Sequence, residues 1–244
     1  MVRVKTGTPG SGKSFSMATQ IKKLLLRGTG VICTVNINLD HVTKNGKLKI
    51  GKFTYIPIYE ITPEFLERYA LENHVKGKEH QTYVFIDECQ LIFNTRDWAQ
   101  SGRRDWLVFF TSHRHYGYEF FLITQDIEML DKQVRALVES EIKHIKLNNY
   151  VWFLPVTLFK AVETWNGSTK PIKMNTEYIL FRKSVSRMYD SYVLFDDLKK
   201  KYPDVLTPEE REKYNLIALY EDSGDIRDPH EMYPDMPSPP EETT

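Results

Sequence analysis

The chain has 244 residues, with 33 Lys and Arg, 33 Asp and Glu, and 13% aromatic residues. This length suffices for one large domain, and the aromatic content excludes a chain that is disordered throughout. Residues 221–244 hold eight acidic residues and one basic residue, Arg227, and the whole chain has a net charge of zero, so residues 1–220 have a net charge of +7. Such a charge fits either an ordinary solvated surface or a binding partner that carries phosphates.

A phosphate-binding loop of the form G-x-x-x-x-G-K-[ST] follows a short predicted strand at Val2–Thr6 and precedes a predicted helix at Phe15–Arg27. Its glycines let the backbone curl so that N–H groups point at phosphate oxygens, while Lys13 adds a positive charge and Ser14 a Mg²⁺ ligand. The helix places its positive end under the phosphates. We expect a nucleotide to be bound by Gly7, Thr8, Pro9, Gly10, Ser11, Gly12, Lys13 and Ser14.

Strands alternate with helices after this loop, which predicts an α/β P-loop NTPase with a mainly parallel sheet flanked by helices. Thr62 and Pro63 have the residue types of an N-cap and a first helical position. Up to residue 126 the predicted elements are strands at Gly30–Val35, Phe53–Tyr59, Thr82–Ile86 and Phe120–Ile123, and helices at Thr62–Asn73 and Arg104–Arg114.

The second half of the chain gives weaker patterns. A hairpin is predicted around Asn148 and Asn149. Residues 221–244 contain five prolines and eight acidic residues, which predicts a disordered tail. We therefore divide the chain into an NTPase domain at residues 1–200, a helical extension at 201–220 and this tail. The predicted elements are helices at Asp131–Glu139, Phe195–Tyr202 and Thr207–Leu219, and strands at Glu141–Leu147, Val151–Phe159 and Thr176–Phe181.

Two carboxylates follow the predicted strand Thr82–Ile86, where a phosphate-loop enzyme needs them. We expect Asp87 to hold Mg²⁺ together with Ser14. Glu88 is the more discriminating residue, because a carboxylate there can polarise a water that attacks the γ-phosphate, which means hydrolysis. The alternative is a pair of solvated carboxylates at a strand end.

Gln125 and several arginines are further candidates. Gln125 ends a strand expected to lie beside the Asp87 strand, where its amide could sense the γ-phosphate or orient the water. Motor ATPases commonly complete each site with an arginine from a neighbouring subunit, and Arg103, Arg104, Arg114 and Arg135 are candidates. Each of these residues could equally be an ordinary surface or salt-bridge residue.

The remaining features favour a cytoplasmic protein. Only Cys33 and Cys89 are present, which suits a reducing compartment. The amino terminus enters the first strand directly, leaving no room for a signal peptide. The longest apolar runs, Trp106–Phe110 and Tyr150–Phe159, are too short for a transmembrane helix.

Four segments together resemble the N-terminal domain of the zonula occludens toxin (Zot) family over about residues 1–200: the phosphate loop, Ile86–Cys89, Ser112–Gly117 and Ile123–Asp126. That family includes assembly proteins of filamentous phages that look like FtsK/HerA-type motor ATPases. The resemblance implies ATP as fuel, virion assembly and extrusion as the task, a ring-like homo-oligomer such as a hexamer, and phage DNA or a coat–DNA complex as cargo. Arg135 lies where family members tend to carry an arginine.

One departure from the family pattern concerns the membrane. Family members usually continue through a transmembrane helix, whereas this chain continues into an acidic, proline-rich tail. We therefore expect one of two arrangements. Either a membrane-embedded assembly partner recruits the protein to the periphery of the host inner membrane, or the same kind of ATPase domain performs another task here.

Three alternatives to the extrusion motor remain open. A DNA packaging or transfer ATPase would share the site and grip DNA with the basic body. A small-molecule kinase also suits a phosphate loop near the start of the chain, although Glu88 argues against it, because a kinase has no use for a hydrolytic water. A nucleotide-gated scaffold or binding protein would recruit partners through the tail, with incidental turnover.

Overall fold

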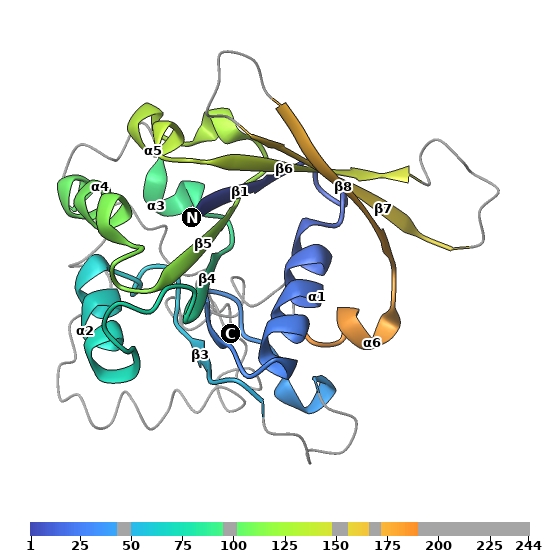
Figure 1. The fold of residues 1–244 in the computed structure, drawn as a ribbon. Helices are drawn as coiled ribbons and strands as arrows, with labels where there is room; N and C mark the ends of the chain where they lie inside the picture. Colours follow the sequence, from blue (N-terminus) through green and yellow to red (C-terminus); the bar gives the residue numbers. More distant parts are fainter. Residues whose placement is uncertain (43–49, 95–101, 148–155, 166–171, 190–244) are drawn as a thin grey trace, which may run out of the picture. The chain divides into compact units, whose positions relative to one another are not determined.

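A mainly parallel sheet organises the chain (Figure 1). The computed structural model describes residues 1–42, 50–94, 102–147, 156–165 and 172–189. Within these residues all neighbouring pairs from β3 to β6 are parallel, and β7 pairs antiparallel with both β6 and β8. The predicted α/β fold is confirmed. In spatial order the strands are β3 (Phe53–Tyr55), β2 (Gly30–Cys33), β4 (Thr82–Ile86), β5 (Tyr118–Ile123), β1 (Val2–Thr6), β6 (Ser140–Lys146), β7 (Leu158–Trp165) and β8 (Ile172–Leu180).

Helices cover both faces of this sheet (Figure 1). One core cluster lies between the sheet and α2 to α5, and the other lies beneath α1 and α6. Val84 and Ile86 of β4 belong to the first cluster and Phe85 to the second. Because both faces are buried, Val31–Cys33 of β2 and Tyr83–Ile86 of β4 are continuous apolar runs, whereas β1 carries Arg3 and Lys5 and β5 carries Glu119. The helices are α1 (Lys13–Leu26), α2 (Pro63–Asn73), α3 (Gln90–Phe93), α4 (Arg103–Ser112), α5 (Lys132–Ala136) and α6 (Lys183–Ser186), with 3₁₀ turns η1 (Leu39–His41) and η2 (Ile127–Met129).

Helix α2 begins and ends where local chemistry predicts. The Thr62 hydroxyl accepts a hydrogen bond from the Phe65 N–H at 3.2 Å, and Pro63 occupies the first helical position. The cap satisfies one of the N–H groups that a helix leaves unpaired, and proline has no N–H to leave unpaired. The predicted extent, Thr62 to about Asn73, is confirmed.

Several predicted elements differ from the observed ones. The strand predicted at Thr176–Phe181 is β8, which includes residues from Ile172 because these pair with β7. The strand predicted at Phe53–Tyr59 ends at Tyr55, ahead of Pro57, which has no N–H for a ladder. The helix predicted at Asp131–Glu139 ends at Ala136, because the Glu139 N–H already bonds to the Val2 carbonyl at 2.9 Å as β6 begins.

The strand predicted at Val151–Phe159 was placed too early. The observed β7 runs from Leu158 to Trp165, with Phe159 and Ala161 buried and Lys160 only partly buried. This alternation is the pattern of a half-covered strand. The antiparallel β6–β7 pair of the predicted hairpin is present, whereas Asn148 and Asn149 lie outside the described residues.

The chain divides into two units, Met1–Ser191 and Tyr192–Thr244, and the second lies outside the described residues. The helices predicted at Phe195–Tyr202 and Thr207–Leu219 lie outside the described residues, as do the extension at 201–220 and the tail at 221–244. The predicted domain boundaries therefore stay predictions. No helix within the described residues is both long enough and apolar enough to cross a membrane.

Lys5 is a charged residue inside the core. Its side chain lies on β1 under α1, where Nζ donates to the Ser16 hydroxyl at 3.1 Å and lies 5.4 Å from the centroid of the Phe121 ring. Lys5 is only 2% exposed, and burial lowers its pKa to about 7. Glu177 and Asp87 raise this pKa and Arg3 lowers it, but burial is the larger effect.

We expect Lys5→Met to raise the free energy of unfolding at pH 6 to 7 by about 2–4 kcal/mol. The unfolded chain holds this proton up to a pKa of about 10.4, so the native state binds fewer protons between pH 7 and that value. Stability should therefore rise with pH over this range in the wild type, and less in the variant. Urea denaturation at several pH values measures the free energy of unfolding, and Lys132→Met, at an exposed position on α5, is the control. A Lys5→Met protein that is no more stable than wild type at pH 6 would contradict the expectation.

Candidate active site

The phosphate loop connects β1 to the start of α1 (Figure 1). Gly7, Gly10 and Gly12 have φ values of 141°, 75° and 93°, which other residues adopt only with strain. Gly12 is the N-cap of α1 and supplies no side-chain cap, so the first N–H groups of the helix are free for an anion. The loop therefore has the form that a bound phosphate chain requires.

Strands β6 and β7 support this loop from the side, a feature that the motif did not predict. A Cβ atom at Gly7 would lie 2.6 Å from the His144 carbonyl, and one at Gly12 would lie 2.6 Å from the Phe159 ring. Both glycines are therefore required by close packing as well as by φ.

Lys13 is folded back onto the loop. Its Nζ donates to the Gly7 carbonyl at 2.6 Å and to the Thr8 carbonyl at 3.3 Å. Burial lowers the pKa of Lys13, and Glu88 and Asp87 partly oppose this. These bonds hold the ammonium inside the loop, where it could exchange the carbonyls for phosphate oxygens.

Asp87 stands at the carboxyl end of β4 and faces the start of α1. Its Oδ2 accepts from the Ser14 hydroxyl at 3.4 Å, and its own N–H donates to the Thr34 hydroxyl at 2.9 Å. Burial first, and then the neighbouring Glu88 carboxylate, raise the pKa of Asp87 to about 6. A hydroxyl and a carboxylate at this separation are hard oxygen ligands that fit Mg²⁺. Thr34, at the end of β2, was not foreseen from the sequence.

Glu88 has an unusual backbone conformation. Its φ is +48°, in the left-handed region that non-glycine residues seldom occupy. The Glu88 N–H donates to Asp87 Oδ1 at 3.0 Å, and the Gln90 amide donates to the Glu88 carboxylate. The first turn after β4 therefore fixes both the backbone and the side chain of Glu88. Gln90 is a second residue that was not foreseen from the sequence.

Gln125 lies just past β5, which pairs with β4 on one side and β1 on the other. The predicted neighbourhood of the Gln125 and Asp87 strands is confirmed. The Gln125 carbonyl accepts the Gly7 N–H at 3.1 Å, so the backbone here also anchors the phosphate loop. Its side chain is exposed.

A cavity of about 540 Å³ adjoins the loop. Its walls include Gln125 from the end of β5 and Lys143, His144 and Lys146 from β6. The Nε2 atom of His144 is buried without a hydrogen-bond partner, and burial lowers the pKa of this residue to about 3. The lysines, together with Asp126 and Glu141, make this wall polar, and the buried imidazole lies behind it.

The arginine candidates are placed in different regions. Arg114 pairs with Glu139 at 2.8 Å, and Arg104 is exposed on α4. The side chain of Arg103 lies outside the described residues. Arg135 lies on α5, and its Nε is buried without a hydrogen-bond partner among the described residues. Among the described residues no hydrogen bond or ion pair joins Arg135 to the loop, and its action in a neighbouring subunit stays a prediction.

The raised pKa of Asp87 predicts a pH dependence. Only the carboxylate form can ligate Mg²⁺, so apparent Mg²⁺ affinity in nucleotide turnover should be about tenfold weaker at pH 5 than at pH 7. Mg²⁺ titrations at the two pH values measure this. ATP itself titrates in this range, so Asp87→Asn is the control, and an equal pH dependence in wild type and variant would contradict the assignment of Asp87.

A family model described as zonular occludens toxin (Zot) matches residues 1–195. The chain belongs to the Zot family. The resemblance seen in the sequence motifs is therefore confirmed.

Curated relatives of this Zot-family chain are Gene 1 proteins of phages. Identity is 27% with that of Enterobacteria phage I2-2, over 59% of this chain and 40% of the relative. It is 29% with that of Salmonella phage IKe, over 57% and 38%, and 25% with that of Enterobacteria phage f1, over 68% and 47%. The matches span less than half the length of these relatives.

Two solved structures are similar to the chain. The N-terminal domain of zonular occludens toxin from Neisseria meningitidis has a TM-score of 0.47 at 17% identity, covering 78% of this chain and 98% of that chain. The DNA-packaging ATPase B204 from Sulfolobus Turreted Icosahedral Virus has a TM-score of 0.46 at 17% identity, covering 71% and 96%.

Proposed function

We propose that this Zot-family chain is an ATP-hydrolysing motor that powers assembly and extrusion of a filamentous phage. The observation that carries the proposal is the meeting of the phosphate loop with Asp87 and Glu88 at one edge of the sheet. A site meant only to bind nucleotide has no need of Glu88, whereas hydrolysis needs a base beside the γ-phosphate.

The roles of the residues follow from their positions. The free N–H groups at the start of α1 and the Lys13 ammonium would bind the phosphates. Mg²⁺, when bound by Ser14 and Asp87, would supply neutralisation of phosphate charge. Glu88 would accept a proton from the attacking water, and Gln125 would orient that water or sense the γ-phosphate.

A ring-like homo-oligomer, such as a hexamer, is part of this proposal. Arg135 from a neighbouring subunit would complete each site, because a cation there offsets the charge that develops on the phosphoryl oxygens. The cargo would be phage DNA or a coat–DNA complex. A membrane-embedded partner would hold the ring at the host inner membrane.

The test is the dependence of ATP turnover on assembly. Turnover per protomer should rise with protein concentration as oligomers form, with mass followed by light scattering. ATP binding without turnover in any assembly state would contradict the motor and favour a nucleotide-gated scaffold.

A DNA packaging or transfer ATPase is the second candidate, favoured by the +7 charge of residues 1–220. The two motors differ in what stimulates them. Turnover that rises with duplex DNA and not with single strands would favour packaging, whereas stimulation by a single-stranded phage genome would favour extrusion.

A further inference from the structure

A second cavity, of about 420 Å³, lies at the amino ends of the parallel strands, whereas the phosphate loop lies at their carboxyl ends. It is lined by residues at the starts of β2 and β4, whereas the loop follows the carboxyl end of β1. The other walls come from the end of α2 and from the residue preceding β3. Four separate segments thus form one hollow that the proposed nucleotide site does not use. We call it the amino-edge pocket.

The charge of the amino-edge pocket is positive. Arg27, Lys52 and Lys78 line it, and no Asp or Glu does. None of these three forms an ion pair with a carboxylate of the described residues. Lys52 is held by neutral groups, because its Nζ donates to the Asn73 side chain at 2.6 Å and lies 5.0 Å from the centroid of the Tyr69 ring. Three positive charges are therefore left without a negative partner.

The walls are fixed in place by hydrogen bonds. The Gln81 amide bonds both backbone groups of Val75, at 2.8 and 2.9 Å, and the Lys78 carbonyl at 2.7 Å. His74 Nε2 lies 2.7 Å from the Thr82 hydroxyl. The turn that carries Lys78 is thus tied to the end of α2, so a ligand would meet a preformed surface.

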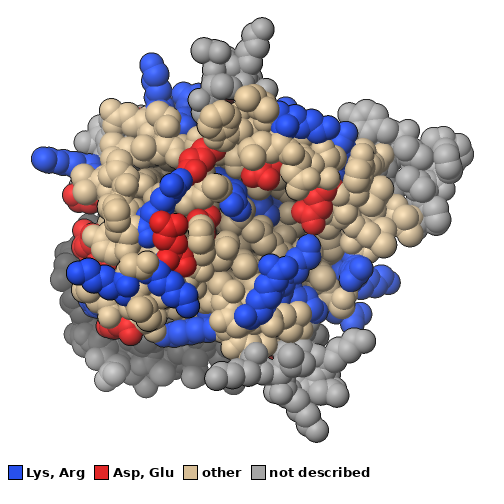
Figure 2. Space-filling model, in the orientation of Figure 1, with Lys and Arg blue, Asp and Glu red and all other residues tan. Residues whose placement is uncertain are grey.

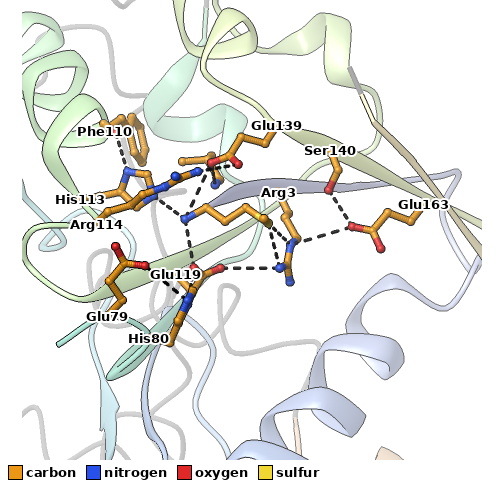
Figure 3. Close-up of polar contacts among 12 residues, drawn as sticks. Arg3, Glu79, His80, Phe110, His113, Arg114, Glu119, Glu139, Ser140 and Glu163 are labelled. Atoms are coloured by element: carbon orange, nitrogen blue, oxygen red, sulfur yellow. Dashed lines mark hydrogen bonds and ion pairs between the residues drawn. The ribbon is translucent and has the colours of Figure 1, made fainter. Parts of the chain in front are cut away.

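Two acidic groups near the pocket contact side chains other than its three lysine and arginine residues (Figure 3). Glu119 is 2% exposed and lies 2.7 Å from His80 Nδ1 and 3.8 Å from Arg3. Glu79 lies 3.6 Å from His80 Nε2. His80 lines the pocket itself and contacts both carboxylates, so Glu79 and Glu119 lie behind it and not on the pocket wall.

The unbalanced charge indicates a ligand with several phosphates. Figure 2 shows several Lys and Arg side chains in the lower half of the drawn face, with some Asp and Glu side chains among them. Three cations spread over separate segments suit a polymer with repeating charges better than a single anion. A hollow of this size also admits the sugar–phosphate units of one strand more readily than a whole duplex.

We infer that the amino-edge pocket binds the phosphate backbone of single-stranded DNA, gripping the cargo on the side of the domain away from ATP. This inference rests on the proposed motor function, since it names where the cargo would be held. Each of the three cations would replace counterions on the strand, so binding should weaken steeply with salt.

The test compares two triple variants with the same loss of charge. One is R27Q/K52Q/K78Q in the pocket, and the other is K132Q/K173Q/K183Q at exposed positions elsewhere. Fluorescence anisotropy with a labelled oligothymidylate gives affinity as a function of salt concentration. Circular dichroism shows whether both variants fold, and ATP turnover without DNA is measured in parallel.

The pocket variant should bind on the order of tenfold or more weakly at low salt, and the slope of log affinity against log salt should fall by about 2. The other triple variant should resemble wild type. Equal binding by the two variants would overturn the inference, as would a pocket-dependent loss of binding to phosphatidylglycerol vesicles without a loss for DNA. Absent turnover in all three proteins would instead count against the motor, whatever the DNA result.

Discussion

Replacing Glu88 with glutamine is expected to lower steady-state ATP turnover by about 100- to 1,000-fold, while ATP affinity stays within about threefold of wild type. Glutamine has nearly the shape of glutamate and can occupy the same turn, where the N–H of residue 88 bonds to Asp87. It cannot accept a proton from water. The variant therefore separates binding from hydrolysis, which an alanine would not do as cleanly.

The control for Glu88→Gln is Glu128→Gln, which removes an equal charge from an exposed position on η2 beyond β5. Turnover should be unchanged in that variant. Single-turnover measurements follow the chemical step without product release. A Glu88→Gln protein with more than about a tenth of the wild-type single-turnover rate would exclude Glu88 as the base.

Replacing Lys13 with alanine is expected to weaken ATP binding by about 100-fold or more, because the ammonium is the positive side chain inside the loop and charge-assisted bonds to phosphate are strong. Folding should survive. Burial already disfavours the charged form of Lys13, and its removal takes a donor only from the buried Gly7 carbonyl and the more exposed Thr8 carbonyl. Fluorescent nucleotide titration measures the affinity, with Lys132→Ala as the control.

The same variant tests the shared site between subunits. Lys13→Ala and Arg135→Ala should each be inactive alone, and mixing them should restore part of the turnover. Mixed rings contain some interfaces with an intact Lys13 on one side and an intact Arg135 on the other. No recovery on mixing, with mixed oligomers present by mass, would remove Arg135 from the proposed site.

The elements that the sequence predicts well are those whose ends are marked by nearby residues, such as a helix cap, a proline or the end of an apolar run. Thr62 and Pro63 mark the start of α2 through a cap and a missing N–H, and both ends of β4 follow from an apolar run that stops at Asp87. The phosphate loop is equally local, because its spacing alone defines the curl of the backbone. These predictions needed no knowledge of neighbouring strands.

Tertiary contacts explain what the sequence could not predict. Thr34 and Gln90 matter only because β2 and the turn after β4 bring them to Asp87 and Glu88. Nothing in the local pattern marks Lys5 as buried, since burial depends on α1 lying over β1. The late start of β7 likewise depends on its pairing with β6. Strand order and long-range packing set these features, and neither is encoded in a short window of residues.

The central claim is that Asp87 and Glu88 serve a hydrolytic motor assembled from several copies of this chain. The most direct measurement is steady-state Mg-ATP hydrolysis by wild type beside Glu88→Gln, with and without DNA, with oligomeric mass recorded on the same samples. We predict turnover that rises with assembly or DNA and collapses in the variant. ATP bound by both proteins and hydrolysed by neither, at every mass observed, would contradict the account.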